Sequence, residues 1–265
     1  MKSLDSHTQK IQKQFNRQAS EYAQTNQAKD VRAMDGLVRL TKTDHSSQTL
    51  DVACGPGRLT MAFARQAKSA TGLDVTENLL DIGRTEAKKL GLDNIKFTFG
   101  SALDMPFKNN NFDTVSCRAA FHHFSEPEQV LKEMVRVLKP GGEILIADIL
   151  GNEDTATATH HDELEQLCDP THVRCIPKSD FERLFDATGL AIKSSRFGTM
   201  NYNVEQWLIH GGPSEKQKNE IRSRFKQSIT TNQTGLNVRN EQGVIKFSHQ
   251  TALFVLEHRT ENKNN

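Results

Sequence analysis

Hydrophobic positions recur at two different spacings along this chain, and the change between them predicts its elements. Between Thr8 and Leu40 the apolar side chains fall three and four residues apart, which is typical of two amphipathic helices. The next segment, "QTLDVACG", is a compact apolar run that ends in glycine and fits a strand buried on both faces. Helical spacing returns in "RLTMAFARQA", so we expect a strand, a turn and a helix in succession.

The strand, turn and helix pattern then repeats. We expect strands at "SATGLDVT", "NIKFTF", "FDTVSCRAAF" and "EILIADIL", with helices at "ENLLDIGRTEAKKL" and "EPEQVLKEMVRVL" between them. Gly91 and Pro140 stand where these two helices should stop. Alternating strands and helices predict a largely parallel sheet with helices on both faces.

The regular pattern breaks after the fifth strand. Residues 151–178 are polar and rich in histidine, and residues 199–246 are a second irregular segment. Between these two segments we expect a helix and a sixth strand. After them we expect a last strand at "SHQTALFVLEHR". Long insertions late in an α/β chain are often lids or substrate walls. We therefore expect one domain over residues 1–265, with an N-terminal helical cap at 1–45 and a ligand-binding core at 46–150.

Composition and charge narrow the class of protein. The chain of 265 residues has 34 Lys and Arg against 33 Asp and Glu, and its basic residues are spread along the sequence. This distribution argues against a nucleic-acid partner and favours a small molecule. The sequence has neither an apolar signal-peptide core nor a stretch long enough to span a membrane, so we expect a cytoplasmic protein. Four scattered cysteines predict reduced thiols.

The stretch "LDVACGPGRLT" predicts a ligand site at the end of the first strand. Gly55 and Gly57 allow a ligand to approach the backbone closely, and the helix that follows presents free N–H groups. In an open α/β sheet such a site lies outside the carboxyl ends of the strands. A dinucleotide site would need a third glycine where Thr60 stands, and Asp51 would repel a pyrophosphate. These departures argue against nicotinamide and flavin nucleotides.

Five segments in this order resemble the class I S-adenosylmethionine-dependent methyltransferases, in particular the small-molecule group similar to the ubiquinone and menaquinone biosynthesis methyltransferases. The segments are "LDVACGPGRLT", "TGLDVT", "GSALDMPF", "NFDTVSCRAAFHHF" and "VLKEMVRVLKPGGEILIAD". The resemblance runs from about Phe15 to Asp148. It implies a Rossmann-like doubly wound sheet of seven strands, mostly parallel with an antiparallel last strand, together with N-terminal helices and inserted lid segments. It also implies S-adenosylmethionine as the cofactor.

The resemblance further implies which residues hold this cofactor. The first motif wraps its methionyl part, with the acid near the ammonium group, and is matched here by Asp51, Ala53, Gly55 and Gly57. Asp74 matches the acid that ends the second strand, whose two oxygens can accept both ribose hydroxyls. The alternative is that Asp74 only caps the helix that begins near residue 77.

The adenine end of the implied site comes from the second and third strands. Val75 and Leu79 would flank the ring. Ser101 stands where relatives often have an acid that accepts from the adenine amino group. A hydroxyl accepts without charge assistance, so we expect a weaker contact there and more recognition from the backbone of Ala102 or Leu103.

Two further positions are implied at the methionine end. Arg118 resembles the residue that lies along the methionine moiety, with a helix-side ion pair as the alternative. Tyr22 resembles the aromatic residue of the N-terminal helix that closes over the cofactor carboxylate, with core packing as the alternative. We assign core packing to Phe15 instead.

Methyl transfer from a sulfonium is an in-line displacement, so the protein must align the reactants and exclude water. An O–H or N–H acceptor also needs a base, and histidine suits that role near neutral pH. His122 and His123 follow the fourth strand, at the edge where the methyl group should point. The alternative for both is a structural role in the turn that leads to Ser125.

A second group of histidines lies in the first insertion, in "HHDELEQLCDPTHVR". We hypothesise that His161 or His172 orients the acceptor; the alternative is a solvated helix and turn. His161, Cys168, His172 and Cys175 could supply four metal ligands, but their spacing matches no familiar zinc pattern, so we expect no metal. We expect Trp207, the single tryptophan, to anchor the second insertion by packing, with stacking on the acceptor as the alternative.

We therefore expect an enzyme that methylates a small-molecule acceptor at O, N or C. Methylation of a quinone precursor fits less well, because Tyr22-Ala23 stands where that branch has a tyrosine–aspartate pair. Two alternatives remain open. The same fold could use S-adenosylmethionine in a non-methylating reaction such as a cyclisation or decarboxylation, or it could act as a cofactor-binding regulatory module, including an RNA-associated one.

Overall fold

A computed structural model describes residues 5–24, 31–209 and 211–259, without the side chains of residues 20–24. Its strands in these residues are β1 (Gln48–Val52), β2 (Ser69–Asp74), β3 (Ile95–Phe99), β4 (Phe112–Arg118), β5 (Leu138–Gly151), β6 (Ile176–Pro177), β7 (Leu190–Asn203), β8 (Arg239–Glu241) and β9 (Val244–His258). The helices are α1 (Ser6–Gln24), α3 (Val31–Val38), α4 (Arg58–Ala64), α5 (Glu77–Lys89), the 3₁₀ turn η1 (Phe121–His123), α6 (Pro127–Val137), α7 (Thr155–Cys168), α8 (Lys178–Ala187), α9 (Val204–Trp207) and α10 (Glu215–Thr231).

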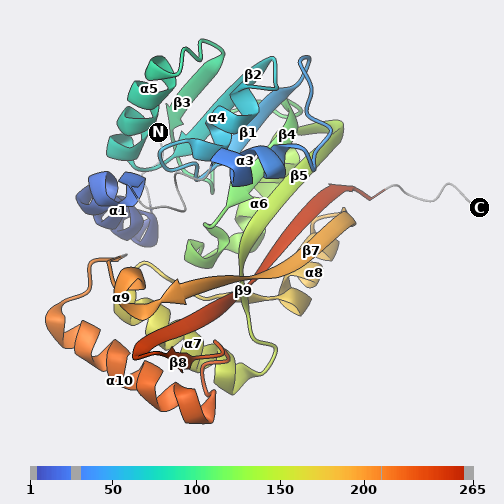
Figure 1. The fold of residues 1–265 in the computed structure, drawn as a ribbon. Coiled ribbons are helices and arrows are strands. Elements are labelled where there is room, and N and C mark those ends of the chain that lie inside the picture. The colour runs from blue at the N-terminus through green and yellow to red at the C-terminus, as the bar shows by residue number, and fades with distance from the viewer. Residues whose placement is uncertain (1–4, 25–30, 210, 260–265) are drawn as a thin grey trace, which may run out of the picture.

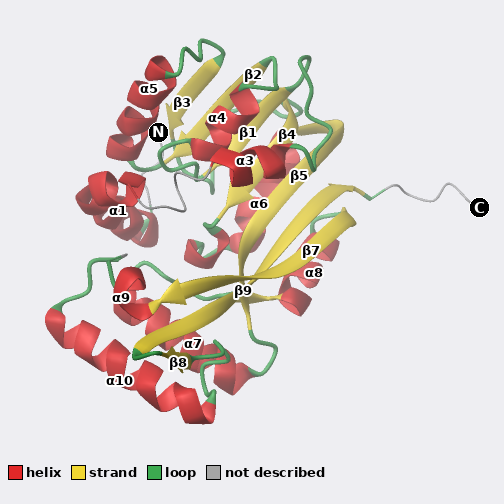
Figure 2. Cartoon of the chain, in the orientation of Figure 1, coloured by secondary structure: helices red, strands yellow, loops and turns green. Residues whose placement is uncertain are grey.

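The strands form one mixed sheet in the order β3-β2-β1-β4-β5-β9-β7 (Figures 1 and 2). Strands β1 to β5 pair in parallel, whereas β9 runs antiparallel to both β5 and β7. The short strands β6 and β8 pair with β5 and β9 outside this path. The predicted seven-stranded, doubly wound sheet with an antiparallel last strand is confirmed.

Helices cover both faces of the sheet and bury its apolar side chains. On one face α6 and α8 pack on β4, β5 and β9, in a cluster that includes Val115, Ile146 and Phe254. On the other face α3 and α4 pack on β2 and β5 around Phe63 and Ala70. A sheet covered on both faces explains why consecutive residues of its central strands are buried, as in β1 and β4. None of the described helices has the length and apolar character that crossing a membrane requires.

Glycine and proline shape the connections beside β1 and β4. Gly57 precedes α4 with φ 75°, and a Cβ there would lie 2.3 Å from the ring of Phe97, so both its conformation and its neighbour require glycine. Pro127 begins α6, where a missing N–H costs no hydrogen bond. That helix ends at Val137, three residues before the predicted stop at Pro140, which instead lies within β5.

The two insertions are more regular than predicted. Residues 151–178 contain α7, whose first turn is capped by Asp154 accepting from the N–H of Thr157, and residues 199–246 contain α9 and α10. Strands β7 and β9 are also longer than predicted, and they extend beyond the core to meet these helices (Figure 1).

A second hydrophobic cluster joins the insertions to the extended ends of β7 and β9. Trp207 packs edge-to-face on Phe225 and Phe247, with ring centroids 5.8 and 5.4 Å away. Leu164 of α7 and Ile221 of α10 belong to the same cluster. The predicted packing role of Trp207 is therefore confirmed.

Candidate active site

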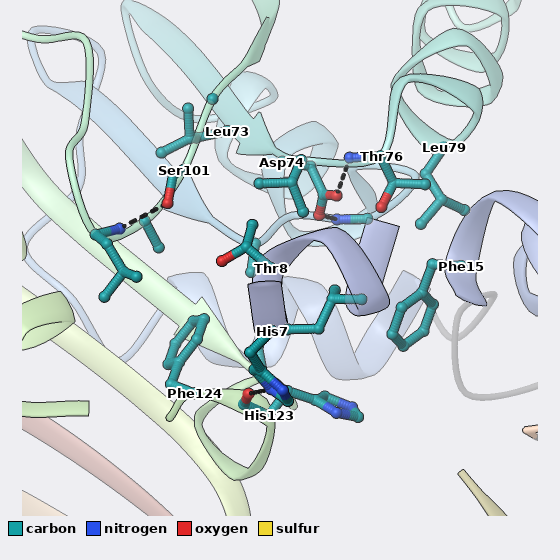
Figure 3. Close-up of a pocket in the computed structure, with 18 of the residues that line it drawn as sticks. His7, Thr8, Phe15, Leu73, Asp74, Thr76, Leu79, Ser101, His123 and Phe124 are labelled. Carbon is teal, nitrogen blue, oxygen red and sulfur yellow. Dashed lines mark hydrogen bonds between the residues drawn. The ribbon is translucent and has the colours of Figure 1, made fainter. Parts of the chain in front are cut away.

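A cavity opens at the carboxyl ends of β1, β2 and β4, which is where an open α/β sheet places ligands (Figure 3). We call it the first cavity; its empty volume, mouth included, is about 780 Å³. Sheet residues line it from one side and α1 covers it from the other. Of the residues predicted to bind a cofactor, those that line this cavity are Ala53, Gly55, Asp74, Val75, Leu79, Ser101, Ala102 and Leu103.

Asp74 is held in place by the backbone on both sides of it. Its Oδ2 accepts from the N–H of Gly55 at 2.8 Å, and its Oδ1 accepts from the N–H of Thr76 at 2.8 Å (Figure 3). Burial raises the pKa of the Asp74 carboxyl, although the hydrogen bonds from the two backbone donors act to lower it. Asp74 lines the cavity, so its two oxygens place hydrogen-bond acceptors at the cavity wall.

The glycine turn between β1 and α4 follows the same contact. Ala53 and Gly55 both have positive φ, 52° and 54°, which turns the chain sharply and brings the Gly55 N–H to Asp74. Gly57 is not among the residues that line the cavity, and its close neighbour is Phe97. Gly57 therefore contributes to the shape of the turn without contacting the cavity.

Val75, Leu79 and the loop after β3 form the apolar end of the first cavity. Leu79 is buried, and the Val75 carbonyl accepts from Nε2 of Gln12 on α1. Ser101 Oγ accepts from the N–H of Leu103 at 3.1 Å. The hydroxyl that was predicted to face the adenine amino group therefore has a partner in its own loop, and it keeps one further acceptor position.

Asp51 and Arg118 lie at a separate, smaller pocket beside Ala53. The Asp51 carboxylate accepts from Thr60 Oγ1 at 2.8 Å and from Ser116 Oγ at 2.9 Å, and burial raises its pKa to about 6. Ala53 lines both this pocket and the first cavity, so the two adjoin. The side chain of Tyr22 lies outside the described residues.

The N-terminal helix contributes residues that the sequence analysis missed. His7, Thr8, Ile11 and Phe15 of α1 line the first cavity, so the assignment of Phe15 to core packing was wrong. Phe15 also lines the neighbouring second cavity and packs edge-to-face on His123. The apolar periodicity of α1 identified a buried face but could not show that a cavity lies beneath it.

The second cavity lies between the sheet and the two insertions. It shares Phe15, Ala119 and His123 with the first cavity, and its empty volume is about 850 Å³. Its apolar wall includes Ile149, Met200, Tyr202 and Trp207, and its polar wall includes His122, His172, Glu165 and His249. No Lys or Arg occurs among the described residues that line it.

His122, which lines the second cavity, forms a buried carboxylate–imidazole pair with Asp148. Nδ1 of His122 lies 2.6 Å from Oδ1 of Asp148, and Oδ2 of Asp148 accepts from the N–H groups of Ala120 and Phe121. Burial opposes the charged imidazolium, but the Asp148 carboxylate outweighs it and raises the pKa of His122. An Nδ1–H that donates to Asp148 leaves Nε2 free to accept a proton.

His123 differs from its neighbour because no carboxylate pairs with it among the described residues. Its Nδ1 lies 3.2 Å from Thr171 Oγ1, and its backbone carbonyl lies 2.8 Å from Nε2 of His7. Burial, together with repulsion from His122, lowers the pKa of His123 to about 3. The imidazole of His123 is therefore neutral near pH 7 and lines the boundary between the two cavities.

His161 and His172 of the first insertion are buried, so the alternative of a solvated helix and turn is wrong for these two, whereas the neighbouring His160 is exposed. His161 is 3% exposed and lies nearest to Glu165 and Cys175; it lines neither large cavity. His172 lines the second cavity, and its Nε2 lies 2.8 Å from Oδ1 of Asp162. The loop that carries His172 docks on η1, where the N–H of Val173 donates to the carbonyl of His122.

A family model described as a methyltransferase domain matches residues 43–212, which include the first cavity's strands and most of the second cavity's wall. The chain belongs to this methyltransferase family. It is an S-adenosylmethionine-dependent methyltransferase, as the resemblance of its five motifs implied.

Relatives of this methyltransferase are found in sequence and in structure. The uncharacterized methyltransferase YcgJ of Bacillus subtilis is 29% identical over 210 residues, 75% of this chain and 82% of the relative. The crystal structure of YcgJ superposes with a TM-score of 0.82 at 25% identity, over 87% of this chain and 100% of that one. The demethylmenaquinone methyltransferase of Listeria welshimeri is 35% identical over 114 residues, 42% of this chain and 48% of that enzyme. The latter match thus spans about half of the relative.

The chemistry of the residues that line the first cavity of this methyltransferase fits S-adenosylmethionine. The carboxylate of Asp74 offers acceptors to a sugar diol, and Val75 and Leu79 offer apolar surface to a planar ring. The adjoining pocket carries the Asp51 carboxylate, which is complementary to an ammonium group.

Proposed function

We propose that this methyltransferase binds S-adenosylmethionine in the first cavity and methylates an O–H or N–H group of a small, largely apolar acceptor in the second. The observation that carries the proposal is the shared wall: Phe15, Ala119 and His123 border both cavities. A donor and an acceptor in adjoining cavities can approach each other without crossing solvent.

The proposed base is His122, which Asp148 orients. When bound, the cofactor supplies a methyl group on a positively charged sulfur. The Nδ1–H of His122 donates to Asp148, and its Nε2 is left to take the proton that the acceptor loses. Asp148 stabilises the imidazolium that forms. The neutral ring of His123 would take part in positioning only.

The walls of the second cavity support an uncharged, partly aromatic acceptor. Tyr202 and Trp207 contribute aromatic surface, and Ile149 and Met200 contribute aliphatic surface. Because no Lys or Arg occurs among its described lining residues, an acceptor that carries a phosphate or carboxylate would find no counter-charge there.

The test follows a labelled methyl group. Full-length protein is incubated with methyl-labelled S-adenosylmethionine and a panel of phenols, catechols and aromatic amines, and products are identified by mass spectrometry. We expect a labelled product from the unaltered protein. His122→Gln should lower the rate at least roughly 100-fold and leave the affinity for S-adenosylhomocysteine unchanged. His45→Gln, an exposed histidine, is the control. A product without label, or full turnover by His122→Gln, would contradict the proposal.

A further inference from the structure

Three buried side chains with metal-ligating atoms converge beside the second cavity, which two of them line, and the proposed methyl transfer uses none of them. His161 and Glu165 lie one turn apart on α7, and His249 comes from β9. Nε2 of His249 lies 2.7 Å from Glu165 Oε1, and Nε2 of His161 lies 3.4 Å from the same oxygen. The three residues are 3%, 8% and 3% exposed, and their ligand atoms all lie within 4.8 Å of one another.

Two imidazole nitrogens and one carboxylate oxygen form the ligand set of open transition-metal sites. Tetrahedral bonds of about 2.0–2.1 Å to one ion would place the ligand atoms roughly 3.3 Å apart. The contact between His161 and Glu165 already matches that spacing. The contact between His249 and Glu165 would have to lengthen by about half an ångström, which the side chain of Glu165 can accommodate.

The surroundings hold the three side chains in place and favour a cation. The rings of His161 and His249 stack with centroids 5.2 Å apart, and α7 is anchored at its start by the Asp154 cap. Nδ1 of His249 is buried without a hydrogen-bond partner among the described residues. The polar contact of this ring is therefore made through Nε2, the atom that faces Glu165. The cavity wall carries carboxylates and no described Lys or Arg.

We propose that His161, Glu165 and His249 bind a divalent transition-metal ion such as Zn²⁺ at the wall of the second cavity. Glu165 and His249 line that cavity, so an ion between them borders the space given to the acceptor and can take an acceptor oxygen as a further ligand. Only the role toward the acceptor rests on the proposed function. The sequence-based prediction of no metal concerned the set His161, Cys168, His172 and Cys175. That set lacks Glu165 and His249, so it is not the site proposed here.

A neighbouring group is a weaker candidate for the same ion. Asp162, His172 and Cys175 also bring ligand atoms within 4.8 Å of one another. Oδ1 of Asp162, however, already accepts from the N–H of Cys175 at 2.7 Å and lies 2.8 Å from Nε2 of His172. These contacts fasten the loop after α7 to the helix, so this group has a structural role that needs no ion.

The test measures ion binding directly, without cofactor or acceptor. Full-length protein is freed of metal with a chelator and titrated with Zn²⁺ by calorimetry and with Co²⁺ by visible absorption. We expect one equivalent to bind, with d–d absorption bands of low coordination number for Co²⁺. Glu165→Gln and His249→Gln should each weaken Zn²⁺ binding at least roughly tenfold. His160→Gln, an exposed neighbour on α7, should leave it unchanged.

Two comparisons make the outcome decisive. The proposed site would be overturned if the protein bound no stoichiometric Zn²⁺, or if Glu165→Gln bound Zn²⁺ as tightly as the unaltered protein. It would also be overturned if Cys175→Ser were the only variant that abolished Zn²⁺ binding. S-adenosylhomocysteine is titrated into the same samples, which also shows that each variant is folded. Normal cofactor binding with no Zn²⁺ binding refutes the metal site alone, whereas Zn²⁺ binding without cofactor binding refutes the proposed function alone.

Discussion

At the scale of the residue, Asp74 links the glycine turn to the proposed cofactor site. Its two oxygens accept backbone N–H groups from the turn after β1 and from the start of α5. The helix-capping alternative is not confirmed, because Thr76 precedes α5 and no side chain caps the first turn of that helix. The carboxylate of Asp74 instead fixes the backbone beside the first cavity, which it also lines.

Replacement of Asp74 tests its role toward the cofactor. We expect Asp74→Ala to weaken S-adenosylhomocysteine binding by about 2 kcal/mol, or roughly 30-fold, because charge-assisted hydrogen bonds are lost. Calorimetry measures the change, and circular dichroism checks the fold. Asp81→Ala, an exposed carboxylate on α5, is the control. Equal affinity in the Asp74 variant would show that the ribose is held elsewhere.

Replacement of Asp148 tests the proposed base through its pH dependence. The Asp148 carboxylate raises the pKa of His122, and only the neutral ring can take a proton, so the rate should fall as pH drops through that raised pKa. In Asp148→Asn, burial remains without the opposing charge, and the acid limb of the profile should move to lower pH. The exposed Asp186→Asn serves as the control. An acid limb that stays in place would rule out His122 as the group that titrates.

The sequence located these residues unevenly, for a physical reason. Asp74 is the last residue of β2, and Gly55 and Ser101 follow shortly after β1 and β3. The ends of adjacent parallel strands meet at one edge of the sheet, so these residues were expected to lie together. Glu165 and His249 are 84 positions apart and meet only because β9 turns back antiparallel and runs past α7. No local pattern carries that information, and the same holds for the contact between Phe15 and His123.

At the scale of the element, α7 shows why its segment was predicted to be irregular. Its buried positions are His161, Leu164, Glu165 and Cys168, which have helical spacing. Two of the four are polar, so the hydrophobic periodicity is diluted although the helix has a buried face. Strands β1, β4 and β5 also bury polar side chains, for example Asp51 and Ser116. They were found because each is a short segment that contains apolar residues and belongs to a repeated order of strand, turn and helix.

Helix α1 is fastened to both the sheet and the insertions, and it covers the first cavity. Nε2 of Gln12 donates to the Val75 carbonyl, and Nε2 of Gln14 donates to the Gly211 carbonyl. Lys10, Lys13 and Arg17 lie on its exposed face and are sites for trypsin. A ligand beneath α1 should hold the helix closed and protect these sites.

Limited proteolysis tests this coupling. We expect saturating S-adenosylhomocysteine to slow tryptic cleavage at Lys10, Lys13 and Arg17, as followed by mass spectrometry of the fragments. Phe15→Ala removes the ring that α1 places against both cavities, so cleavage should be faster and protection smaller. Cleavage at the exposed Lys216 on α10 gives an internal control. Unchanged cleavage in a sample that calorimetry shows to be saturated would mean that α1 does not respond to the cofactor.

At the scale of the whole molecule, we group the hydrophobic clusters on the two faces of the sheet as the first core and call the cluster around Trp207 and Phe225 the second core. The sheet and its covering helices build the first cavity, while the cluster around Trp207 and Phe225 holds the helices that wall the second. Strands β7 and β9 run through both parts (Figure 1). Damage to the second core should therefore affect the acceptor side more than the cofactor side.

Phe225→Ala tests that separation. Phe225 is fully buried against Phe247, with ring centroids 4.7 Å apart, so its truncation should destabilise the second core by about 3–5 kcal/mol. The fluorescence of Trp207, the single tryptophan, reports on this core, whereas far-UV circular dichroism reports on the whole chain. In denaturant we expect the fluorescence transition of the variant to precede the dichroism transition, while S-adenosylhomocysteine affinity changes less than about threefold. Phe197→Ala, at a half-exposed ring on β7, should shift neither transition much. Coincident transitions with loss of cofactor binding would instead show that β7 and β9 couple the two cores into one cooperative unit.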